Sequence, residues 1–231
     1  ENLMTMAFVA LMSMVVMSCD DEWHEHYYFD MDEALDAYFG RYGDFGTDDG
    51  TTADWFDYYY TYASQYDYRD FMNAVMSEID NSRGLMARYL NGDWEGPLRM
   101  YYKNKYGQSV YTDYQVTWHF EHSVGSDIRG RGTEWRYNSD EGESAVNFSW
   151  FVNRYGGIEM SYDAGSPVDE PVNMLISYSN LDHLSANRFK GVSVGVNIDE
   201  EDEFDLRKCL PQRNKVSAKM AGKTLGGKKL N

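Results

Sequence analysis

The sequence predicts an all-β domain, an eight-stranded antiparallel up-and-down β-barrel preceded by a short helical segment. From Trp94 onward, apolar side chains recur at every second position, which is the period of a strand with one buried face. The connections between these strands, such as NKYGQ, HSVGS and RYGG, are short and turn-like, so none can hold a helical crossover. Aromatic residues make up 16% of the chain and prolines number only 4, a composition that favours strands.

A two-sheet sandwich is the alternative, since its strands show the same period. The Greek-key crossings of a sandwich usually need at least one longer connection, and the connections in this sequence are all short. Eight consecutive antiparallel strands can instead close on themselves and leave no strand edge exposed. We therefore expect the barrel.

The first 18 residues are similar to a secretory signal peptide. Residues 7–17 are apolar except for Ser13, a length that suits such a signal and is too short to span a bilayer. The stretch VMSC at 16–19 resembles the lipobox of bacterial lipoproteins, which implies cleavage before Cys19 and a lipid on its thiol. The acids directly after Cys19 resemble the export signal of surface lipoproteins of the Bacteroidota type, which implies an outer-membrane protein that faces the cell surface. A buried strand with a free cysteine is the alternative, but it would bring the charges of DDEWHE next to a core.

Residues 19–70 are predicted to form an acidic, tyrosine-rich tether. Residues 20–70 hold 15 acids, two basic residues and ten tyrosines, and Leu35 is their only Leu, Ile or Val. Because no aliphatic core can form there, we expect a solvated stalk; the alternative is that its aromatic rings lie against the barrel or stack on sugar rings. Within this segment, Asp30 followed by Glu33 predicts an N-cap and a short helix over 31–39.

The barrel domain is predicted over residues 71–209, with a leading helix. Phe71, Val75 and Ile79 recur at a spacing of four, and the apolar stripe resumes at 85–90 after a break at 81–84. Eight strands follow, each with one apolar face. Their expected inward residues, at every second position, are Trp94 to Tyr102, Tyr114 to Phe120, Trp135 with Tyr137, Val146 to Val152, Ile158 to Tyr162, Val172 to Tyr178, Val192 to Ile198, and Phe204 with Leu206.

The junction between the helix and the first strand carries a family resemblance. LNGDWEG at 90–96 is similar to the Gly-x-Trp opening of lipocalins and related calycin barrels, and the resemblance covers about residues 85–209. It implies a lipocalin-like domain of the kind carried by Bacteroidota lipoproteins, in which Trp94 closes the floor of the barrel. It also implies that an arginine from a late strand packs over that tryptophan, with Arg207 as the first candidate and Arg188 as the second.

The sequence contains no pattern typical of an enzyme. It lacks a Gly-x-Ser-x-Gly stretch, a phosphate-binding glycine loop and a metalloprotease histidine pair, so we expect no catalysis, no cofactor and no metal site. His24 with His26, or His119 with Glu121, could touch a metal, but exposed histidines near acids are common. The acid run at 199–203 is expected to be a solvated hairpin tip. The formal net charge of −17 argues against nucleic acid as a partner.

The predicted barrel leaves two functions open, both on a membrane reached through the lipid anchor. In the first, five bulky aromatic side chains line a lumen that binds a small hydrophobic, aromatic or saccharide ligand. These are Trp118, Trp135, Tyr137, Trp150 and Tyr178. In the second, the same side chains fill the barrel, and the protein is structural or engages an envelope protein partner. The tail at 210–231, rich in lysine and glycine, is expected to be disordered.

Overall fold

The computed structural model describes residues 29–47, 49–164, 170–209, 224–225 and 228–229. They belong to two compact units. The helical unit contains the described residues up to Gly43 and residues 47–75, and the barrel unit contains residues 44–46 and the chain from Met76 onward. The signal segment, Cys19 and most of the tail lie outside the described residues, so the expectations about them stay predictions.

The helices are α2 (Met31–Tyr42), α3 (Asp49–Tyr59) and α4 (Gln65–Leu90), with a 3-10 helix η1 (Tyr178–Asn180). The strands are β1 (Gly92–Lys103), β2 (Ser109–His122), β3 (Arg129–Asn138), β4 (Gly142–Val152), β5 (Ile158–Tyr162), β6 (Val172–Ile176), β7 (His183–Leu184), β8 (Arg188–Gly195), β9 (Glu200–Lys208), β10 (Thr224–Leu225) and β11 (Lys228–Lys229). Among the described helices, none has the length and apolar character needed to cross a membrane.

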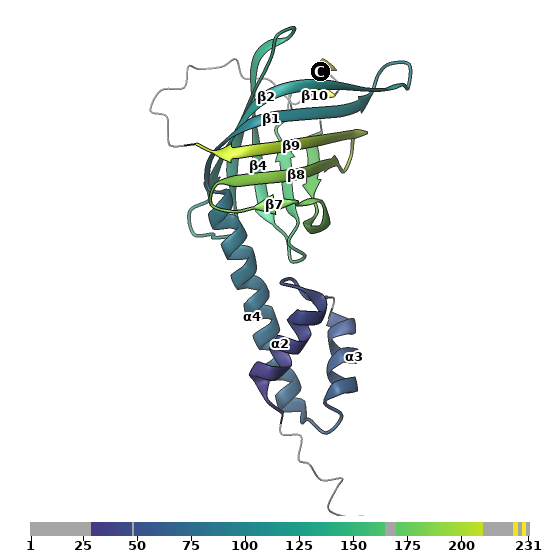
Figure 1. Ribbon diagram of the computed structural model, residues 1–231, viewed down its shortest axis with the longest axis vertical. Coiled ribbons are helices and arrows are strands. Elements are labelled where there is room, and N and C mark those ends of the chain that lie inside the picture. The colour runs from purple at the N-terminus through teal and green to yellow at the C-terminus, as the bar shows by residue number, and fades with distance from the viewer. Residues whose placement is uncertain (1–28, 48, 165–169, 210–223, 226–227, 230–231) are drawn as a thin grey trace, which may run out of the picture. The chain divides into compact units, whose positions relative to one another are not determined.

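Eight antiparallel strands close into a barrel, which confirms the predicted fold class (Figure 1). Strands β1 to β6 pair in chain order, and β1 also pairs with the last barrel strand, β9. The ring closes where β6 meets β8, through Met174 opposite Gly195 and Leu175 opposite Val194. The two-residue strand β7, which the sequence did not predict, attaches to the edge of β8. The result is compatible with a lipocalin-like architecture.

The third strand presents the opposite face from the one expected. Trp135 is half-buried on the outside of the barrel, and Tyr137 is 54% exposed there. The inward positions of β3 are instead held by Gly130, Gly132, Glu134 and Arg136.

The volume of the barrel interior explains this orientation of β3. Gly130 lies opposite Trp150 and Gly132 lies opposite Phe148 across the β3–β4 pair, so the smallest residues face large rings. A Cβ added to Gly132 would lie 2.3 Å from Cζ of Phe148. Small barrels alternate small and large residues in this way to fill their interior. On the outer face, Trp135 lies opposite Ala145 and leaves that alanine 1% exposed.

Strand β8 also presents the opposite face from the one expected, which had Val192 to Ile198 pointing inward. In β8 the buried residues are Phe189, Gly191 and Ser193, while Val192 and Val194 are half-exposed on the outside. A shift of one residue exchanges the two faces of a strand because its side chains alternate. The valine pattern in this strand therefore marks the outer surface.

Residues 29–43 and 47–75 form a helical unit with an aromatic core, which corrects the expected solvated stalk. Tyr38, Trp55, Phe56 and Phe71 are at most 6% exposed, and neighbouring ring centroids lie 5.0 to 5.7 Å apart. The Tyr38 hydroxyl lies 2.7 Å from Oγ1 of Thr52, so its polar atom is satisfied within the core. Each aromatic ring buries as much surface as a large aliphatic side chain or more, so these rings form most of a core in which Ala34 and Val75 are the aliphatic members.

The N-cap predicted at Asp30 is confirmed. Its Oδ1 accepts hydrogen bonds from the backbone N–H groups of Asp32 and Glu33, at 3.0 and 3.2 Å. The helix continues beyond the expected residue 39 to Tyr42 and ends at Gly43, whose φ of +73° favours glycine.

The break expected at 81–84 is absent, because α4 continues without interruption to Leu90. Within the barrel unit, the guanidinium of Arg83 donates two hydrogen bonds to the carbonyl of Val152, at 3.1 and 2.9 Å. These bonds tie the second half of α4 to the end of β4. The polar residues that suggested a loop therefore belong to a helix that is held by the barrel.

We expect Gly132→Ala to destabilise the barrel by about 1–3 kcal/mol, because the new Cβ would lie 2.3 Å from Phe148 and 2.4 Å from the His119 carbonyl. The same change at Gly84 in α4 meets no atom within 4 Å and should stabilise the protein by about 0.5–1 kcal/mol. Urea unfolding of both variants measures the difference. Equal effects at the two sites would contradict the proposed filling of the barrel.

Candidate functional site

The start of β1 packs against the end of α4. Trp94 is fully buried, and its Nε1–H donates to the Leu90 carbonyl at the end of α4, at 2.7 Å. Lys208, at the end of β9, places Nζ 4.3 Å from the centre of a Trp94 ring. The same ammonium donates to the carbonyls of Tyr89 and Asn91, and burial lowers the pKa of Lys208. One cation therefore contacts the Trp94 ring and satisfies carbonyls at the end of α4.

Arg207, which the family resemblance implied over Trp94, points to the other side of the sheet. It is exposed on the outer face of β9, opposite Glu95 of β1. Arg188, the second candidate, also lies outside, where it binds both carboxylate oxygens of Asp205 at 3.0 and 2.8 Å. Even-numbered positions of β9 face inward, so the cation over Trp94 comes from position 208.

Aromatic rings fill the half of the barrel next to Trp94. Trp118 and Trp150 lie inside, as expected, and both are at most 2% exposed. Phe189 contacts the rings of Trp94, Trp118 and Phe204, with centroids 4.7 to 5.8 Å apart. Such spacing leaves rings in direct contact rather than around an open lumen.

Tyr178, the remaining expected lumen residue, is not on a barrel strand. It lies in η1, is 46% exposed, and its ring centroid is 4.8 Å from that of Phe45. Phe45 is 7% exposed and also packs against Gly156, where an added Cβ would lie 2.5 Å from its ring. Tyr178 therefore helps to hold the segment 44–46 on the barrel.

A buried polar cluster occupies the barrel interior beyond the aromatic rings. Glu134 is fully buried, and its Oε2 accepts hydrogen bonds from Nε1 of Trp118 at 3.1 Å and from the hydroxyl of Tyr162 at 2.6 Å. Arg136 places Nη1 3.9 Å from the other carboxylate oxygen of Glu134. Burial and the nearby Glu134 carboxylate raise the pKa of Tyr162 well above its usual value. Tyr162 therefore stays a neutral hydrogen-bond donor.

Two more carboxyl groups join this cluster from β9. Glu200 and Asp202 are 3% and 1% exposed, which corrects the expectation of a solvated hairpin tip for these two acids, whereas Glu201 and Glu203 of the same run are exposed. Burial acts to lower the pKa of Arg136, but the carboxylates of Glu134, Glu200 and Asp202 raise it overall. The guanidinium is therefore charged and holds carboxyl groups from two strands together.

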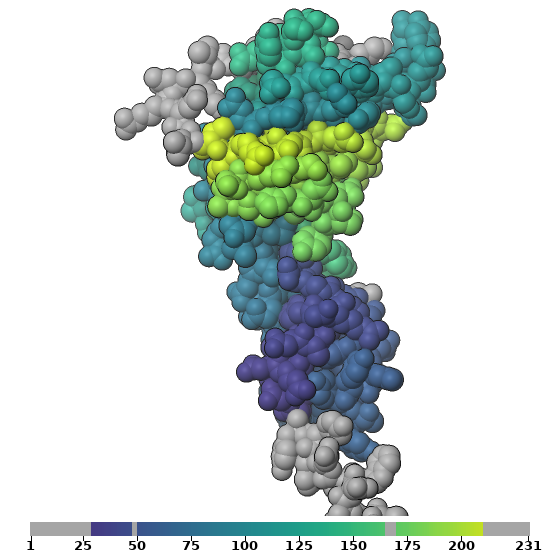
Figure 2. Space-filling model, in the orientation of Figure 1, coloured from purple at the N-terminus to yellow at the C-terminus, as the bar shows by residue number. Residues whose placement is uncertain are grey.

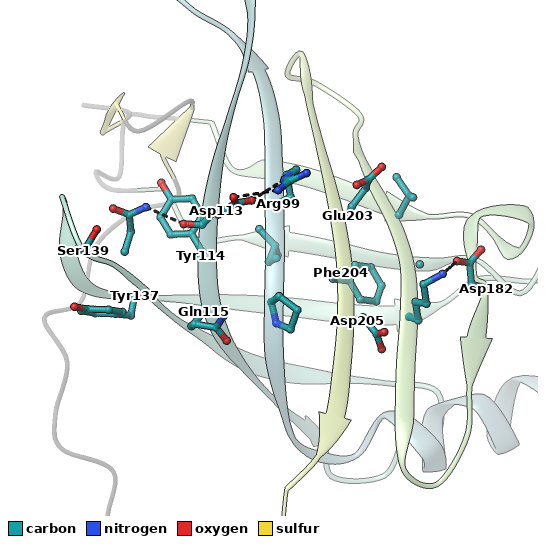
Figure 3. A pocket seen from close by; sticks show the side chains of 16 residues that line it. Arg99, Asp113, Tyr114, Gln115, Tyr137, Ser139, Asp182, Glu203, Phe204 and Asp205 are labelled. Carbon is teal, nitrogen blue, oxygen red and sulfur yellow. Dashed lines mark hydrogen bonds and ion pairs between the residues drawn. The ribbon is translucent and has the colours of Figure 1, made fainter.

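The outer surface of the barrel carries a groove of about 850 Å³ over β1, β2, β3, β8 and β9 (Figure 3). The outer face of β1, β9 and β8 faces the viewer in Figure 2. Tyr137 and Gln115 are neighbours across β3 and β2 and lie along one side of the groove, and Pro97 is the neighbour of Gln115 on β1. Lys190, paired with Asp182 at 2.5 Å, lies on the other side.

The middle of β1 explains the depression. Pro97 is the outward-facing residue there, because Trp94 and Leu98 of the same strand are buried on the inner face. Proline has a short, rigid ring and no N–H to donate to a neighbouring strand. The floor of the groove is therefore low and apolar, between longer side chains on both sides.

The charged groups around the groove are held in fixed positions. Arg99 binds Asp113 with two hydrogen bonds, at 2.7 and 3.1 Å, which keep the pKa of Asp113 below its usual value. The side chain of Glu203 accepts a hydrogen bond from the Tyr101 hydroxyl at 3.1 Å. Asn138 donates to the carbonyl of Asp113 at 2.8 Å. These groups present oriented oxygen and nitrogen atoms to a polar ligand.

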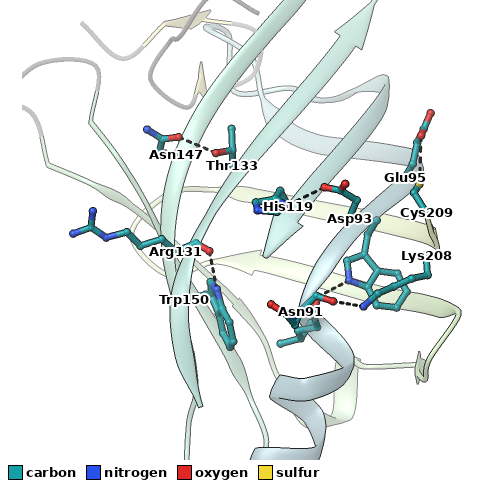
Figure 4. A network of polar contacts seen from close by, with 12 residues as sticks. Asn91, Asp93, Glu95, His119, Arg131, Thr133, Asn147, Trp150, Lys208 and Cys209 are labelled. Carbon is teal, nitrogen blue, oxygen red and sulfur yellow. Dashed lines mark hydrogen bonds and ion pairs between the residues drawn. The ribbon is translucent and has the colours of Figure 1, made fainter. Parts of the chain in front are cut away.

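A row of polar side chains crosses four strands elsewhere on the outer face. Asp93, His119, Thr133 and Asn147 are successive neighbours from β1 to β4, with His119 Nδ1 2.9 Å from Asp93 Oδ1 and Thr133 donating to Asn147 at 3.0 Å (Figure 4). His119, considered above as a metal ligand with Glu121, is thus engaged by Asp93. Across the part of the chain that the structure describes, no group of three or more His, Cys, Asp or Glu side chains is placed to hold a metal ion.

Comparison with protein-family models, with curated proteins and with solved structures finds no match for this chain.

We expect Lys208→Met to lower the free energy of unfolding by about 0.5–2 kcal/mol, because it removes the cation from the Trp94 ring and from the carbonyls at the end of α4. Arg207→Met makes the same change one position earlier, on the exposed face, and should alter stability by at most about 0.5 kcal/mol. Urea unfolding monitored by tryptophan fluorescence compares them. A larger loss of stability in Arg207→Met than in Lys208→Met would indicate that Arg207 packs over Trp94, as the family resemblance implied.

We expect Tyr162→Phe to cost about 1–3 kcal/mol, because it leaves a buried carboxylate oxygen of Glu134 without one of its donors. Tyr106→Phe, at a side chain 74% exposed, is the control and should be nearly neutral. The folded pKa of Tyr162 is raised, so its contribution is fully present below the unfolded tyrosine pKa of about 10 and is lost as pH rises above it. The stability difference between wild type and Tyr162→Phe should therefore be constant at neutral pH and shrink in alkaline urea titrations.

Proposed function

We propose that the protein is a lipid-anchored, surface-exposed lipoprotein of the outer membrane that binds a neutral saccharide in the groove on the outside of its lipocalin-like barrel. It acts as a binding protein without catalysis or cofactor. The membrane anchor is the lipid on Cys19, which lies outside the described residues. One observation carries the proposal: aromatic rings occupy the barrel interior, whereas a groove of about 850 Å³ lies on the outer face of the barrel.

The chemistry of the groove supports a saccharide. Tyr137 offers a ring face that is partly open to solvent, beside the amide of Gln115 and the apolar ring of Pro97. A sugar ring has apolar C–H faces and a rim of hydroxyl groups, so it suits an aromatic platform flanked by amides and carboxylates. The paired Asp113 carboxylate is already oriented by Arg99, so binding has a small ordering cost.

The charge of the groove favours a neutral ligand. Asp113, Asp182, Glu203 and Asp205 line it together with Arg99 and Lys190. Acids thus outnumber bases, which opposes an anionic ligand such as a phosphorylated or uronic sugar. The formal net charge of −17 for the whole chain acts in the same direction.

A protein partner is the second candidate. An apolar floor at Pro97 and Val192 with charged pairs at its edges also resembles the centre and rim of a protein interface. The filled interior agrees with this alternative equally well, because neither function needs a lumen. Binding of purified oligosaccharides separates the two.

We expect at least one neutral hexasaccharide, tested among maltohexaose, cellohexaose, xylohexaose, mannohexaose and chitohexaose, to bind with an affinity measurable by isothermal titration calorimetry. Tyr137→Ala should weaken that binding about tenfold or more, because it removes the aromatic platform. Tyr155→Ala is the matched control, since Tyr155 is 55% exposed against 54% for Tyr137 and lies outside the groove.

The outcomes are distinct. If Tyr137→Ala and Tyr155→Ala weaken saccharide binding equally, the binding site is not in the groove. Failure of all five sugars, with a stable envelope protein retained by wild type and lost in Tyr137→Ala, would replace the saccharide by the protein partner.

A further inference from the structure

We propose that four exposed tyrosines of the helical unit lie in the headgroup layer of the membrane that carries the protein. They are Tyr58, Tyr59, Tyr62 and Tyr66, and together they are called the tyrosine surface. The inference rests on the proposed function in one respect, the lipid anchor at Cys19. It adds a second contact with the same membrane, made by folded side chains.

The exposed rings of the helical unit lie close together in the sequence, around the connection from α3 to α4, and those of Tyr58 and Tyr59 are 4.9 Å apart. Tyr58, Tyr59, Tyr62 and Tyr66 are 78%, 51%, 94% and 69% exposed. Among the described residues of this unit, all the exposed large hydrophobic or aromatic side chains fall within residues 58–66. Exposed apolar side chains scattered singly need no explanation, whereas a contiguous group marks a contact surface.

These rings are not required by the core of the unit. The neighbouring Trp55 and Phe56 are at most 6% exposed and pack on Phe71, so the core is complete beneath them. A tyrosine has an apolar ring and a polar hydroxyl, and such side chains concentrate where a membrane meets water. The group therefore has the chemistry of an interfacial contact.

Each basic residue of this acidic segment contacts one tyrosine of the surface. Arg41 and Arg69 are the two basic residues of the stretch 20–70. Arg41 donates from Nη1 to the hydroxyl of Tyr59 at 3.2 Å, and the guanidinium of Arg69 lies 5.2 Å from the centre of the Tyr66 ring. Guanidinium groups bind phosphate oxygens well, so they suit the phosphates of lipid headgroups.

The chain enters the helical unit beside the tyrosine surface. Phe29, the first described residue, has its ring 5.3 Å from that of Tyr60, which lies between Tyr59 and Tyr62 in the sequence. The start of α2 and the connection from α3 to α4 occupy the same end of this unit (Figure 1). Nine residues separate Cys19 from Phe29, so the two can be at most about 36 Å apart. A lipid on Cys19 would therefore hold the tyrosine surface within reach of the membrane.

The charge of the surface selects the kind of lipid. Asp54, Asp57, Asp67 and Asp70 lie within four residues of these tyrosines in the sequence and outnumber the two arginines. Electrostatic attraction to anionic lipid therefore does not drive the contact, and burial of tyrosine rings among zwitterionic headgroups does. Contact with such vesicles should persist at high salt, because screening weakens charge attraction and not ring burial.

The test uses the chain from residue 19 onward, attached to phosphatidylcholine vesicles through an N-terminal hexahistidine tag and a nickel-chelating lipid. Cys19→Ser and Cys209→Ser remove the native thiols, and a nitroxide is attached at Tyr62→Cys or, as the control, at Tyr106→Cys in the barrel. Both tyrosines are exposed, 94% and 74%. Power saturation in electron paramagnetic resonance should show that the label at 62 is accessible to oxygen and shielded from a water-soluble nickel complex. The label at 106 should be accessible to the nickel complex, as expected for a label in water. Labels that behave alike in water would overturn the proposal.

A second measurement separates this proposal from the lipid anchor. Without the tag, replacing all four tyrosines by serine in the same chain should lower its partition onto phosphatidylcholine vesicles about tenfold or more, with helicity unchanged by circular dichroism. An unchanged partition would also overturn the proposal. Independently, Cys19→Ala in the full chain tests lipidation by loss of incorporated palmitate in an exporting bacterium. If the wild-type chain incorporates no palmitate, the proposed lipid anchor is wrong, whereas the membrane contact measured at residue 62 is unaffected by that result.

Discussion

The contact between Trp94 and Lys208 is the interaction on which the rest of the barrel depends. It joins the end of α4, the first barrel strand and the last barrel strand at one buried ring. The ammonium of Lys208 contacts that ring and also satisfies carbonyls at the end of the helix, so the end of the helix and the closure of the barrel are stabilised by the same group. With β1 held against β9, the eight strands form a continuous ring of backbone hydrogen bonds.

Closure of the ring gives the interior a limited volume, and this limit decides where recognition takes place. Gly130 and Gly132 make room for Trp150 and Phe148, and the carboxyl groups around Arg136 occupy the space beyond the rings. An interior filled in this way leaves the outside for ligands. There the low floor at Pro97 forms the groove, and the helical unit presents its tyrosine surface.

The sequence alone predicts the number, order and antiparallel pairing of the barrel strands, because alternation and short turns are local signals. It does not predict which side of β3 and β8 faces inward, since Trp135 and the valines of β8 are apolar residues on the outer surface. The alternation of Gly130 and Gly132 was the available signal for β3, because small residues mark positions opposite large rings. The helical unit was missed because its core is aromatic, and the groove because it arises from residues on five separate strands.

The way the ring closes also bears on the order of events in folding. Lys208 and Tyr89 are 119 positions apart in the chain, so the contact that completes the barrel must wait until nearly all of it has been synthesised. Bringing such distant segments together has a large entropic cost, whereas the helical unit contains mainly nearby contacts. A nascent chain would therefore hold its N-terminal helices well before its sheet, with the Trp94 ring still in water until the last strand arrives.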